Sequence, residues 1–313
     1  MTEKFVRTLA KNTPKEVDNE VKISGFVQAR RDHGKLLFID LRDRSGLVQV
    51  VFNPRVSEEA HKTASELRPE FAVSIKGKVK MRPERLINPK MESGTVEVEA
   101  LGLEVLSAAE TLPFDMGSES LNLELPTLLD YRSLTLRHEK VRTIFETQDA
   151  ILEGFKKVSR ELDCVEVVVP TISASSTEGG SEVFKFDYYG HQAFMTQSPQ
   201  LYKQMMVPVF ERVFTIAHAY RAEPSVTTRH LAETTMIDFE IGFVNFEELL
   251  DLFEKVIVET LKYAEHTFES KLREFGARPL VFGQIPRLTL RESQEVIFKE
   301  YGRVNRAEKH LTP

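Results

Sequence analysis

The sequence predicts an α+β protein in which a small β-barrel precedes a larger antiparallel sheet backed by helices. Three observations predict it. Short apolar runs broken by turn residues fill the first hundred residues, long segments of helical periodicity appear only after residue 140, and strand-like runs follow one another directly between those segments. The length of 313 residues is enough for two domains that each bury a core.

The first domain, residues 1–107, is predicted to be a five-stranded barrel. A helix-like patch at 57–67 falls between the third and fourth of its strand-like runs, which are 21–27, 35–43, 47–53, 71–81 and 95–107. The second and third runs are joined by Asp43-Arg44-Ser45-Gly46, a tight turn that ends in glycine. This order suits an OB-fold, whose strand 2–3 face binds oligonucleotides, although a generic five-stranded barrel has the same strand count.

Residues 108–137 carry Pro113 and Pro126 and are predicted to be a linker. The second domain, residues 138–313, contains two segments with apolar residues at helical spacing, 141–162 and 246–275. Strand-like runs lie between these helices, at 165–172, 184–189, 210–223 and 234–244. Because the strands outnumber the helices and often follow one another directly, we expect an antiparallel sheet.

Composition narrows the classes of function. The N-terminus lacks the apolar core of a signal peptide and no apolar run is long enough to span a membrane, so we expect no membrane partner and a cytoplasmic location. The single cysteine, Cys164, excludes a disulfide framework and a cysteine-rich zinc site. The net charge of −6 argues against nucleic-acid binding by bulk positive charge, but QARRDHGK at 28–35 is locally basic.

The stretch RAEPSVTTRHLAE, residues 221–233, concentrates charged side chains in the loop of a predicted hairpin. Arg221 and Glu223 share one face of the first arm, because strand side chains alternate. An arginine fork in a cleft suits a phosphate, and the arginine and histidine of the loop could reach a polyphosphate. A carboxylate beside them could accept an adenine amino group or hold a metal. The alternative is a salt-bridged surface hairpin.

This segment resembles motif 2 of the class II aminoacyl-tRNA synthetases, an Arg-x-Glu after an aromatic residue, here Tyr220, followed by a loop and an Arg/His pair. CVEVVVPTI, which contains Pro170, resembles motif 1, the helix and strand that form the dimer interface. STEGGSEVFKFDYYGHQAFMTQSPQLYKQMM, residues 176–206, resembles the aspartyl-tRNA synthetases. Residues 25–54 resemble their anticodon-binding OB domain, and LLDYRSLTLR resembles the segment that joins the two domains.

The resemblance implies an aspartate–tRNA ligase, which makes aspartyl-adenylate from L-aspartate and ATP and passes the aspartyl group to the 3′ end of tRNA(Asp). Catalysis of this kind is largely positioning and charge neutralisation. Arg221 would hold the α-phosphate and the attacking carboxylate, and Glu223 would accept from the adenine amino group. Arg229 and His230 would touch the outer phosphates, and Glu233 belongs to the same ATP site. The family also implies Mg2+ and a homodimer.

The same resemblance implies an aspartate pocket. Lys203 would bind the substrate side chain and Glu178 its ammonium group. Gln200 and Ser198 would line the pocket, and Gln197 would lie near the α-carboxylate or the tRNA 3′ end. A lysine ammonium group attracts a carboxylate strongly and a neutral amide only weakly, which favours aspartate over asparagine as the substrate.

A structural alternative exists for QSPQLYKQ, the stretch that contains this lysine. It is typical of a helix start, with Ser198 as the cap, Pro199 at the first position and Lys203 in solvent. Both interpretations can hold together, because a helix N-terminus is a good place to mount a substrate contact.

In the OB domain the resemblance implies that Phe38 stacks on an anticodon base, that Gln49 reads a base edge and that Arg31 contacts base or backbone. The alternative for Phe38 is a place in the barrel core. Its apolar neighbours Leu37 and Ile39 indicate that apolar side chains occupy both faces there, so Phe38 is available for the outer face.

Two departures from the family pattern qualify these expectations. Thr234 stands where family members usually carry an aromatic residue for adenine. Nothing after Phe275 resembles motif 3, so we expect either a fragment of a longer product or a truncated relative, with the metal ligands unassigned. A non-catalytic tRNA-binding relative, an asparaginyl-tRNA synthetase and an ammonia-using asparagine synthetase remain alternatives, and charging of tRNA(Asn) stays open.

Overall fold

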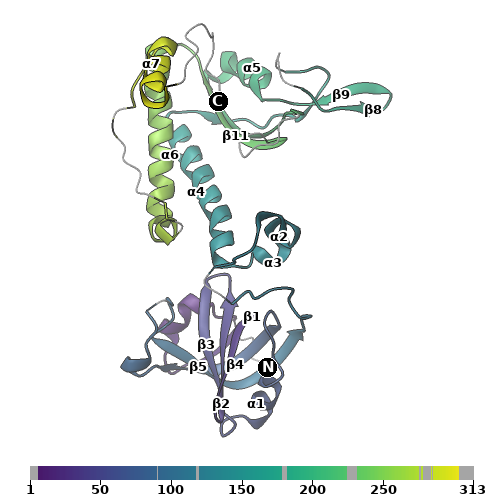
Figure 1. Ribbon diagram of the computed structural model, residues 1–313, viewed down its shortest axis with the longest axis vertical. Coiled ribbons are helices and arrows are strands. Elements are labelled where there is room, and N and C mark those ends of the chain that lie inside the picture. Colours follow the sequence, from purple (N-terminus) through teal and green to yellow (C-terminus); the bar gives the residue numbers. More distant parts are fainter. Residues whose placement is uncertain are drawn as a thin grey trace. The chain divides into compact units, whose positions relative to one another are not determined.

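The computed structural model describes residues 6–89, 91–117, 120–177, 182–223, 231–274, 276–277, 283 and 285–302. The chain divides into two compact units, Met1–His138 and Glu139–Pro313. Each unit has its own hydrophobic core. The expected division of the chain into a barrel and a helix-backed sheet is visible in the ribbon (Figure 1).

The N-terminal unit is a closed barrel with the strand order β1-β2-β3-β5-β4. Its strands are β1 (Glu20–His33), β2 (Leu36–Asp43), β3 (Gly46–Phe52), β4 (Ala72–Met81) and β5 (Val96–Ser107). Its outlying helices are α1 (Glu58–Ala64) and two 3-10 helices, η1 (Ala10–Glu16) and η2 (Glu84–Leu86). Antiparallel pairing of β1 with β4 and parallel pairing of β3 with β5 close the barrel. The predicted OB-type barrel, with a helix after its third strand, is confirmed.

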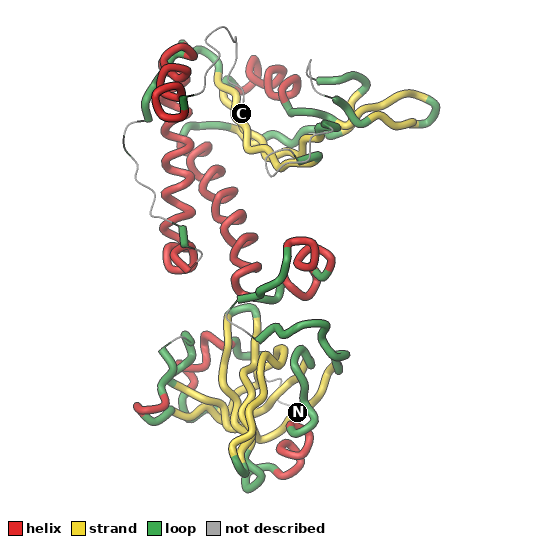
Figure 2. The backbone as a smooth tube through the Cα atoms, viewed as in Figure 1, coloured by secondary structure: helices red, strands yellow, loops and turns green. Residues whose placement is uncertain are grey.

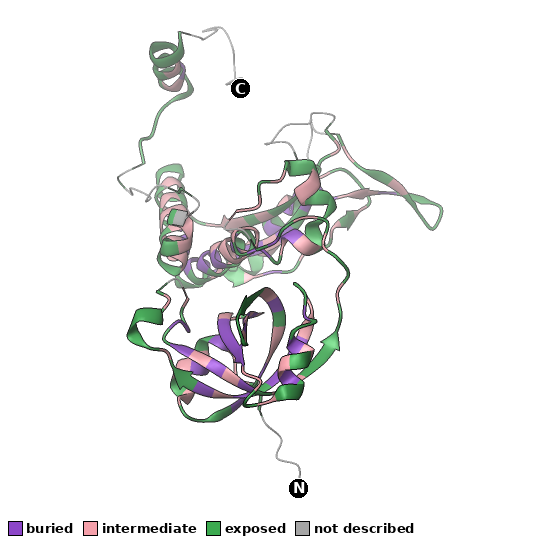
Figure 3. Cartoon of the chain, turned by 60° about the horizontal axis from the view of Figure 1, so that its bottom comes forward, coloured by how far each residue is buried: buried purple, intermediate pink, exposed green. Residues whose placement is uncertain are grey.

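Strict alternation on β2 separates the barrel core from the outer face. Leu37, Ile39 and Leu41 are buried in the core, whereas Phe38 lies between two of them in sequence and is only partly buried. Phe38 therefore points to the outer face, a position for which the sequence analysis found it available. Figure 3 shows that buried residues also occur along the other barrel strands, in β3 as a run of five, residues 48–52.

The turn between β2 and β3 is fixed by one aspartate. Asp43 accepts hydrogen bonds from the backbone nitrogen and the hydroxyl of Ser45, at 2.7 and 2.6 Å, and from the backbone nitrogen of Ala10 at 2.8 Å. Gly46 has a φ of +136°, which side chains rarely tolerate, so glycine is required there. The turn also anchors η1 against the barrel.

Helix α1 begins at a serine cap, and the contribution of this cap to the free energy of unfolding can be measured. The Ser57 hydroxyl accepts a hydrogen bond from the backbone nitrogen of Ala60 at 3.3 Å. Replacing Ser57 by alanine is expected to lower the free energy of unfolding by about 1 kcal/mol, since one amide at the helix start loses its acceptor. Urea denaturation followed by circular dichroism checks this, with Ser57→Asp as the control that retains the cap. Equal losses in both variants would contradict it.

The segment predicted as a linker, 108–137, belongs to the N-terminal unit, and its C-terminal part is helical. It contains α2 (Leu125–Asp130) and α3 (Arg132–Thr135). The buried Thr135 hydroxyl donates to the carbonyl of Leu128 at 2.9 Å, and the rings of Phe114 and Tyr131 meet edge to face. Pro126, which suggested a linker, lies in the first turn of α2, where a missing N–H costs nothing.

The C-terminal unit contains four helices and two small sheets within the described residues (Figure 2). The helices are α4 (Glu139–Glu161), α5 (Gln200–Phe210), α6 (Phe246–Glu274) and α7 (Leu290–Tyr301). One sheet has the order β11-β10-β6 and the other β7-β9-β8. Their strands are β6 (Val165–Glu166), β7 (Ile172–Ser173), β8 (Lys185–Tyr188), β9 (His191–Met195), β10 (Arg212–Tyr220) and β11 (Glu233–Ile241). Helices α4 and α5 pack against the sheet that contains β10 and β11. Both long predicted helices are confirmed.

The core of this unit joins the first long helix to the sheet. Phe155 of α4 meets Phe214 of β10 edge to face, with ring centroids 5.7 Å apart, and both rings are fully buried. Cys164 lies in the same cluster, 5% exposed, and burial raises the pKa of its thiol. At Gly154 an added Cβ would come within 3.0 Å of Tyr263, so α4 and α6 approach closely at this glycine.

One strand prediction was too long. Residues 165–172 were expected to form one strand, but only β6 and the start of β7 are strand within that range. β6 pairs in parallel with β10 for two residues, and Val168 is 95% exposed. Pro170 has no N–H to donate, so the ladder cannot run through it. Of the helices within the described ranges, none combines the length and apolar character that crossing a membrane requires.

Candidate functional site

The charged hairpin forms at the predicted place in the C-terminal unit. β10 and β11 are antiparallel, with Tyr220 opposite Glu233 at the end nearest the loop. The backbone nitrogen of Arg221 donates to the carbonyl of Ala232 at 3.0 Å, so the pairing continues one residue beyond the strands. Arg221 and Glu223 are both exposed. The hairpin therefore presents Arg221 at a fixed backbone position with its side chain accessible.

Glu233 is held by side chains of the neighbouring strand. The Tyr220 hydroxyl donates to its carboxylate at 3.2 Å, and Nδ1 of His218 lies 3.3 Å from the same oxygen. Burial raises the pKa of the Tyr220 hydroxyl, and the charge of the Glu233 carboxylate raises it further. Glu233 is thus positioned at the mouth of the hairpin by groups that the sequence analysis did not assign to it.

Lys203 is buried against the hairpin and not solvated, which corrects the structural alternative for the helix start. Its side chain on α5 is 3% exposed. The ammonium group forms ion pairs with Asp238 and, at 3.2 Å, with Glu240. Both carboxylates come from β11, where alternation places residues 238 and 240 on one face. The sequence signal for this cluster was present in the spacing of MIDFE, but its partner helix is distant in the chain.

The charges of this cluster favour a zwitterionic ligand. One ammonium and two carboxylates leave one negative charge in excess at a largely buried position. An ammonium has three N–H donors, of which one is hydrogen-bonded to Asp238, while Glu240 lies at ion-pair distance. The cluster can therefore present a cation to a ligand carboxylate and negative charge to a ligand ammonium group. A free amino acid carries both groups.

The segment before α5 connects this cluster to the hairpin. The Tyr220 backbone nitrogen donates to the carbonyl of Thr196 at 2.9 Å. Gln197 is fully buried, and its backbone nitrogen donates to the Thr177 hydroxyl at 3.2 Å. The segment that leads into α5, with Gln197 next to Thr196, therefore lies beside the hairpin that carries Arg221.

The start of α5 differs by one position from the expected cap. The helix begins at Gln200, with Pro199 in the capping position. The hydroxyl of Ser198, one residue earlier, still accepts a hydrogen bond from the Gln200 backbone nitrogen at 3.3 Å. Ser198 is buried and Gln200 is partly buried, so neither side chain is fully exposed to solvent.

For some of the predicted site residues the structure gives no contact at the site. Glu178, Arg229 and His230 lie outside the described residues. Pro170 is exposed between β6 and β7. Within the described ranges no group of three or more His, Cys, Asp or Glu side chains is placed to hold a metal ion.

On the barrel, two predicted anticodon residues lie on the outer face. Phe38 packs its ring edge to face with His33, at a centroid distance of 5.5 Å. Arg31 forms a bidentate ion pair with Asp40, with N–O distances of 2.6 and 2.7 Å. The hydrogen bonds to Asp40 raise the pKa of the Arg31 guanidinium, so this group stays charged. The pair holds the guanidinium beside the β1–β2 face.

The third predicted anticodon residue, Gln49, is nearly buried. It is 7% exposed, and its amide nitrogen donates to Glu97 at 3.0 Å. Its amide oxygen accepts from Arg82 at 3.2 Å. Burial raises the pKa of the Glu97 carboxyl, and this outweighs the opposing effect of the Arg82 charge. Sequence reasoning missed Glu97 and Arg82, because both reach Gln49 from strands or turns far along the chain.

The Glu97 charge is expected to cost stability at neutral pH. Its pKa in the folded protein lies above the ordinary value of 4.5, so the stability it contributes is present below that pH and is lost as pH rises through the raised pKa. Glu97→Gln should therefore raise the melting temperature at pH 7. At pH 4 the difference from the parent should shrink towards zero. Differential scanning calorimetry at both pH values checks this, and a variant that is less stable at pH 7 would contradict it.

Similarity to known proteins follows the two units. Residues 21–106 match the family described as OB-fold nucleic acid binding domain, and residues 124–311 match tRNA synthetases class II (D, K and N). The chain is 36% identical over 305 residues to the aspartate–tRNA(Asp/Asn) ligase of Deinococcus radiodurans, covering 96% of this chain and 66% of that protein. It is 39% identical over 303 residues to that of Thermus thermophilus, covering 95% and 67%.

The chain therefore spans about two thirds of the length of these relatives. Among solved structures, the asparaginyl-tRNA synthetase of Pyrococcus horikoshii complexed with asparaginyl-adenylate matches with a TM-score of 0.79 and 25% identity, covering 97% of this chain and 69% of that one. The match to the class II description covers more than half of the chain and includes the hairpin, α5 and the Lys203 cluster. The chain belongs to the class II tRNA synthetases of the D, K and N group.

Proposed function

We propose that this chain carries the anticodon-binding and amino-acid-activating parts of an aspartate–tRNA ligase. The observation that carries the proposal is Lys203, buried beside two carboxylates and next to the hairpin that presents Arg221. A cation in that position selects a ligand with a carboxylate. The relatives in Deinococcus and Thermus named above support the same activity.

The proposed first step is attack on ATP by the α-carboxylate of aspartate. An oxygen of that carboxylate forms a bond to the α-phosphorus, and the bond from this phosphorus to pyrophosphate breaks. Negative charge builds up on the α-phosphoryl oxygens, which a guanidinium fork can neutralise. Arg221 supplies the fork, and Glu223 accepts from the adenine amino group. In the second step a 3′-terminal hydroxyl of tRNA forms the ester and AMP leaves.

Specificity for aspartate follows from the Lys203 cluster. A remaining donor of the ammonium group binds the side-chain carboxylate of the substrate, while Asp238 and Glu240 keep the ammonium in place. An asparagine side chain offers only a neutral oxygen, which gains less from a buried cation. Glu178 binds the substrate ammonium group, with Gln197, Ser198 and Gln200 around the pocket.

The barrel is proposed to bind the anticodon of tRNA(Asp). Phe38 stacks on a base, Arg31 contacts base or backbone, and Gln49 reads a base edge through its hydrogen-bonded cluster. The name of the relatives leaves tRNA(Asn) open as a second substrate. ATP enters with Mg2+, and the proposal includes a cytoplasmic homodimer with Pro170 at its interface.

The test is aspartate-dependent exchange of pyrophosphate into ATP by the chain of residues 1–313. Exchange with L-aspartate, and none with asparagine or lysine, is the expected result. Exchange with asparagine alone would favour an asparaginyl-tRNA synthetase, to which the similarity with the Pyrococcus structure also points. Absence of exchange with all three amino acids, together with retained binding of an anticodon stem-loop, would favour a tRNA-binding relative instead.

A further inference from the structure

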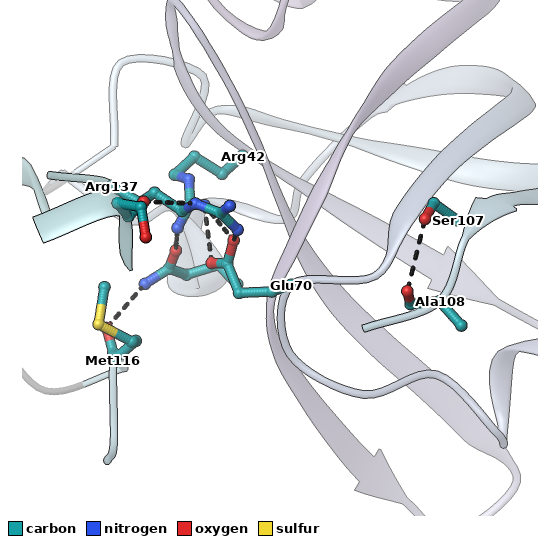
Figure 4. A network of polar contacts seen from close by, with 8 residues as sticks. Arg42, Glu70, Ser107, Ala108, Met116 and Arg137 are labelled. Carbon is teal, nitrogen blue, oxygen red and sulfur yellow. Dashed lines mark hydrogen bonds and ion pairs between the residues drawn. The ribbon is translucent and has the colours of Figure 1, made fainter. Parts of the chain in front are cut away.

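A buried carboxylate fixes the segment 108–137 to the barrel. Glu70 lies just before β4, and its side chain is 2% exposed. Both of its oxygens accept from Arg42 of β2, at 2.7 and 2.9 Å. One of them also accepts from Arg137, which follows α3, at 2.7 Å. Figure 4 shows both arginines converging on Glu70. One carboxylate thus joins the barrel wall to the end of the segment.

Four further contacts strengthen the junction, two hydrogen bonds and two between a guanidinium group and a ring. Arg42 donates to the side-chain oxygen of Gln28 on β1, and the amide nitrogen of Gln28 donates to the carbonyl of the buried Met116 at 3.2 Å. The guanidinium groups of Arg42 and Arg137 lie 5.8 and 5.7 Å from the centre of the Phe26 ring. The segment is therefore held to the barrel at two separate points, Met116 and Arg137.

The backbone conformation at Glu70 is unfavourable for a residue with a side chain. Its φ is +67°, a conformation that residues with a side chain seldom adopt. Its backbone nitrogen donates to the carbonyl of Val27 at 2.8 Å, and the nitrogen of Val27 donates to the carbonyl of Phe71 at 3.0 Å, which holds the turn. Glycine would adopt this φ at a lower conformational free energy. A strained, buried glutamate is consistent with a role of its carboxylate.

We infer that Glu70 is a positioning residue, which clamps the segment 108–137 so that the barrel and the covalent link to α4 behave as one body. The inference rests on the proposed function. One tRNA must then engage the anticodon face of the barrel and the activating site of the other unit together. A link that is already ordered lowers the cost of that second engagement, because less conformational freedom is lost on binding.

Arg137→Gln is the variant that tests the clamp. It removes the ion pair of the segment with Glu70 but leaves the pair of Glu70 with Arg42 and the contact of Gln28 with Met116 intact. Arg68→Gln, an exposed change of the same charge two residues before Glu70, is the matched control. Arg137→Lys retains the charge and is expected to restore part of the effect. Glu70→Gln weakens the contact with Arg137 as well, but it also removes the charge that pairs with Arg42.

The first measurement is hydrogen exchange of the whole chain, which requires no activity. Amides in 120–137 should exchange faster in Arg137→Gln than in the parent or in Arg68→Gln, whereas amides of β1–β5 should not change. Unchanged exchange in 120–137 would overturn the clamp whatever the chain catalyses. Faster exchange throughout the barrel would also overturn it, since Glu70 would then be part of general stability.

The second measurement compares binding of a tRNA(Asp) transcript with binding of its anticodon stem-loop alone. In the parent the transcript should bind more tightly. Arg137→Gln should lower the affinity for the transcript by about tenfold and leave the stem-loop affinity and pyrophosphate exchange unchanged. Equal losses for both RNAs would overturn the positioning role. If the parent binds neither RNA, the proposed function fails, while the hydrogen-exchange result still decides whether the clamp exists.

Discussion

Replacing Lys203 by methionine is expected to abolish aspartate-dependent exchange and to lower the free energy of unfolding by about 3 kcal/mol. Methionine fills most of the volume of the lysine stem but supplies no cation. Asp238 and Glu240 then face each other with no counter-charge in a largely buried cluster. Removing one member of a buried ion pair costs more than the pair itself contributes, because the remaining charge is desolvated without compensation.

A combined variant separates the two effects. Adding Asp238→Asn and Glu240→Gln to Lys203→Met removes the uncompensated charges, so the free energy of unfolding should recover while exchange stays absent. Lys255→Met, an exposed change on α6, is the control for lysine replacement. Chemical denaturation and the exchange assay are measured on the same preparations. Retained aspartate exchange in Lys203→Met would remove this residue from the pocket.

Replacing Arg221 by lysine is expected to lower kcat/KM for exchange about a hundredfold with little change in stability. The side chain is exposed at the end of the hairpin, and its backbone nitrogen pairs with the carbonyl of Ala232, a bond that lysine also makes. A lysine keeps the charge but loses the planar fork that can contact two oxygens at once. The loss is therefore expected in transition-state binding and not in folding.

Steady-state kinetics of exchange check this, with ATP and aspartate varied in turn. Arg160→Lys, an exposed change of the same kind on α4, is the matched control. A hundredfold loss confined to KM for ATP would indicate that Arg221 binds the ground state only. An unchanged kcat/KM would show that the hairpin arginine takes no part in the reaction.

Local patterns were sufficient for most of the secondary structure. The five barrel strands and both long helices follow from periods of 2.0 and 3.6 residues, which depend on neighbours in sequence. The sequence left Phe38 available for the outer face, and the alternation of burial along β2 in the structure places it there. The failures come where a local signal has two meanings. Pro126 indicated a linker but starts a short helix, and VEVVVPTI reads as one strand although Pro170 interrupts its ladder.

The candidate site was predicted only in its composition. The family resemblance identified Lys203, Ser198 and Arg221, and the structure brings their segments together. The partners of Lys203 could not be predicted, because α5 and β11 meet through tertiary packing and not through any local period. Gln49 illustrates the same limit. Its exposure depends on Glu97 from a strand that closes the barrel much later in the chain.

The burial of Cys164 makes the chain a convenient background for fluorescence labelling. It is the only cysteine in the sequence, it is 5% exposed, and its raised pKa keeps the thiol in its unreactive protonated form at pH 7. Maleimide dyes would therefore react with cysteines introduced on the surface and leave Cys164 unlabelled. Arg55→Cys on the barrel and Lys255→Cys on α6 would carry a donor and an acceptor. Single-molecule energy transfer between them would then report how tRNA alters the separation of the two units.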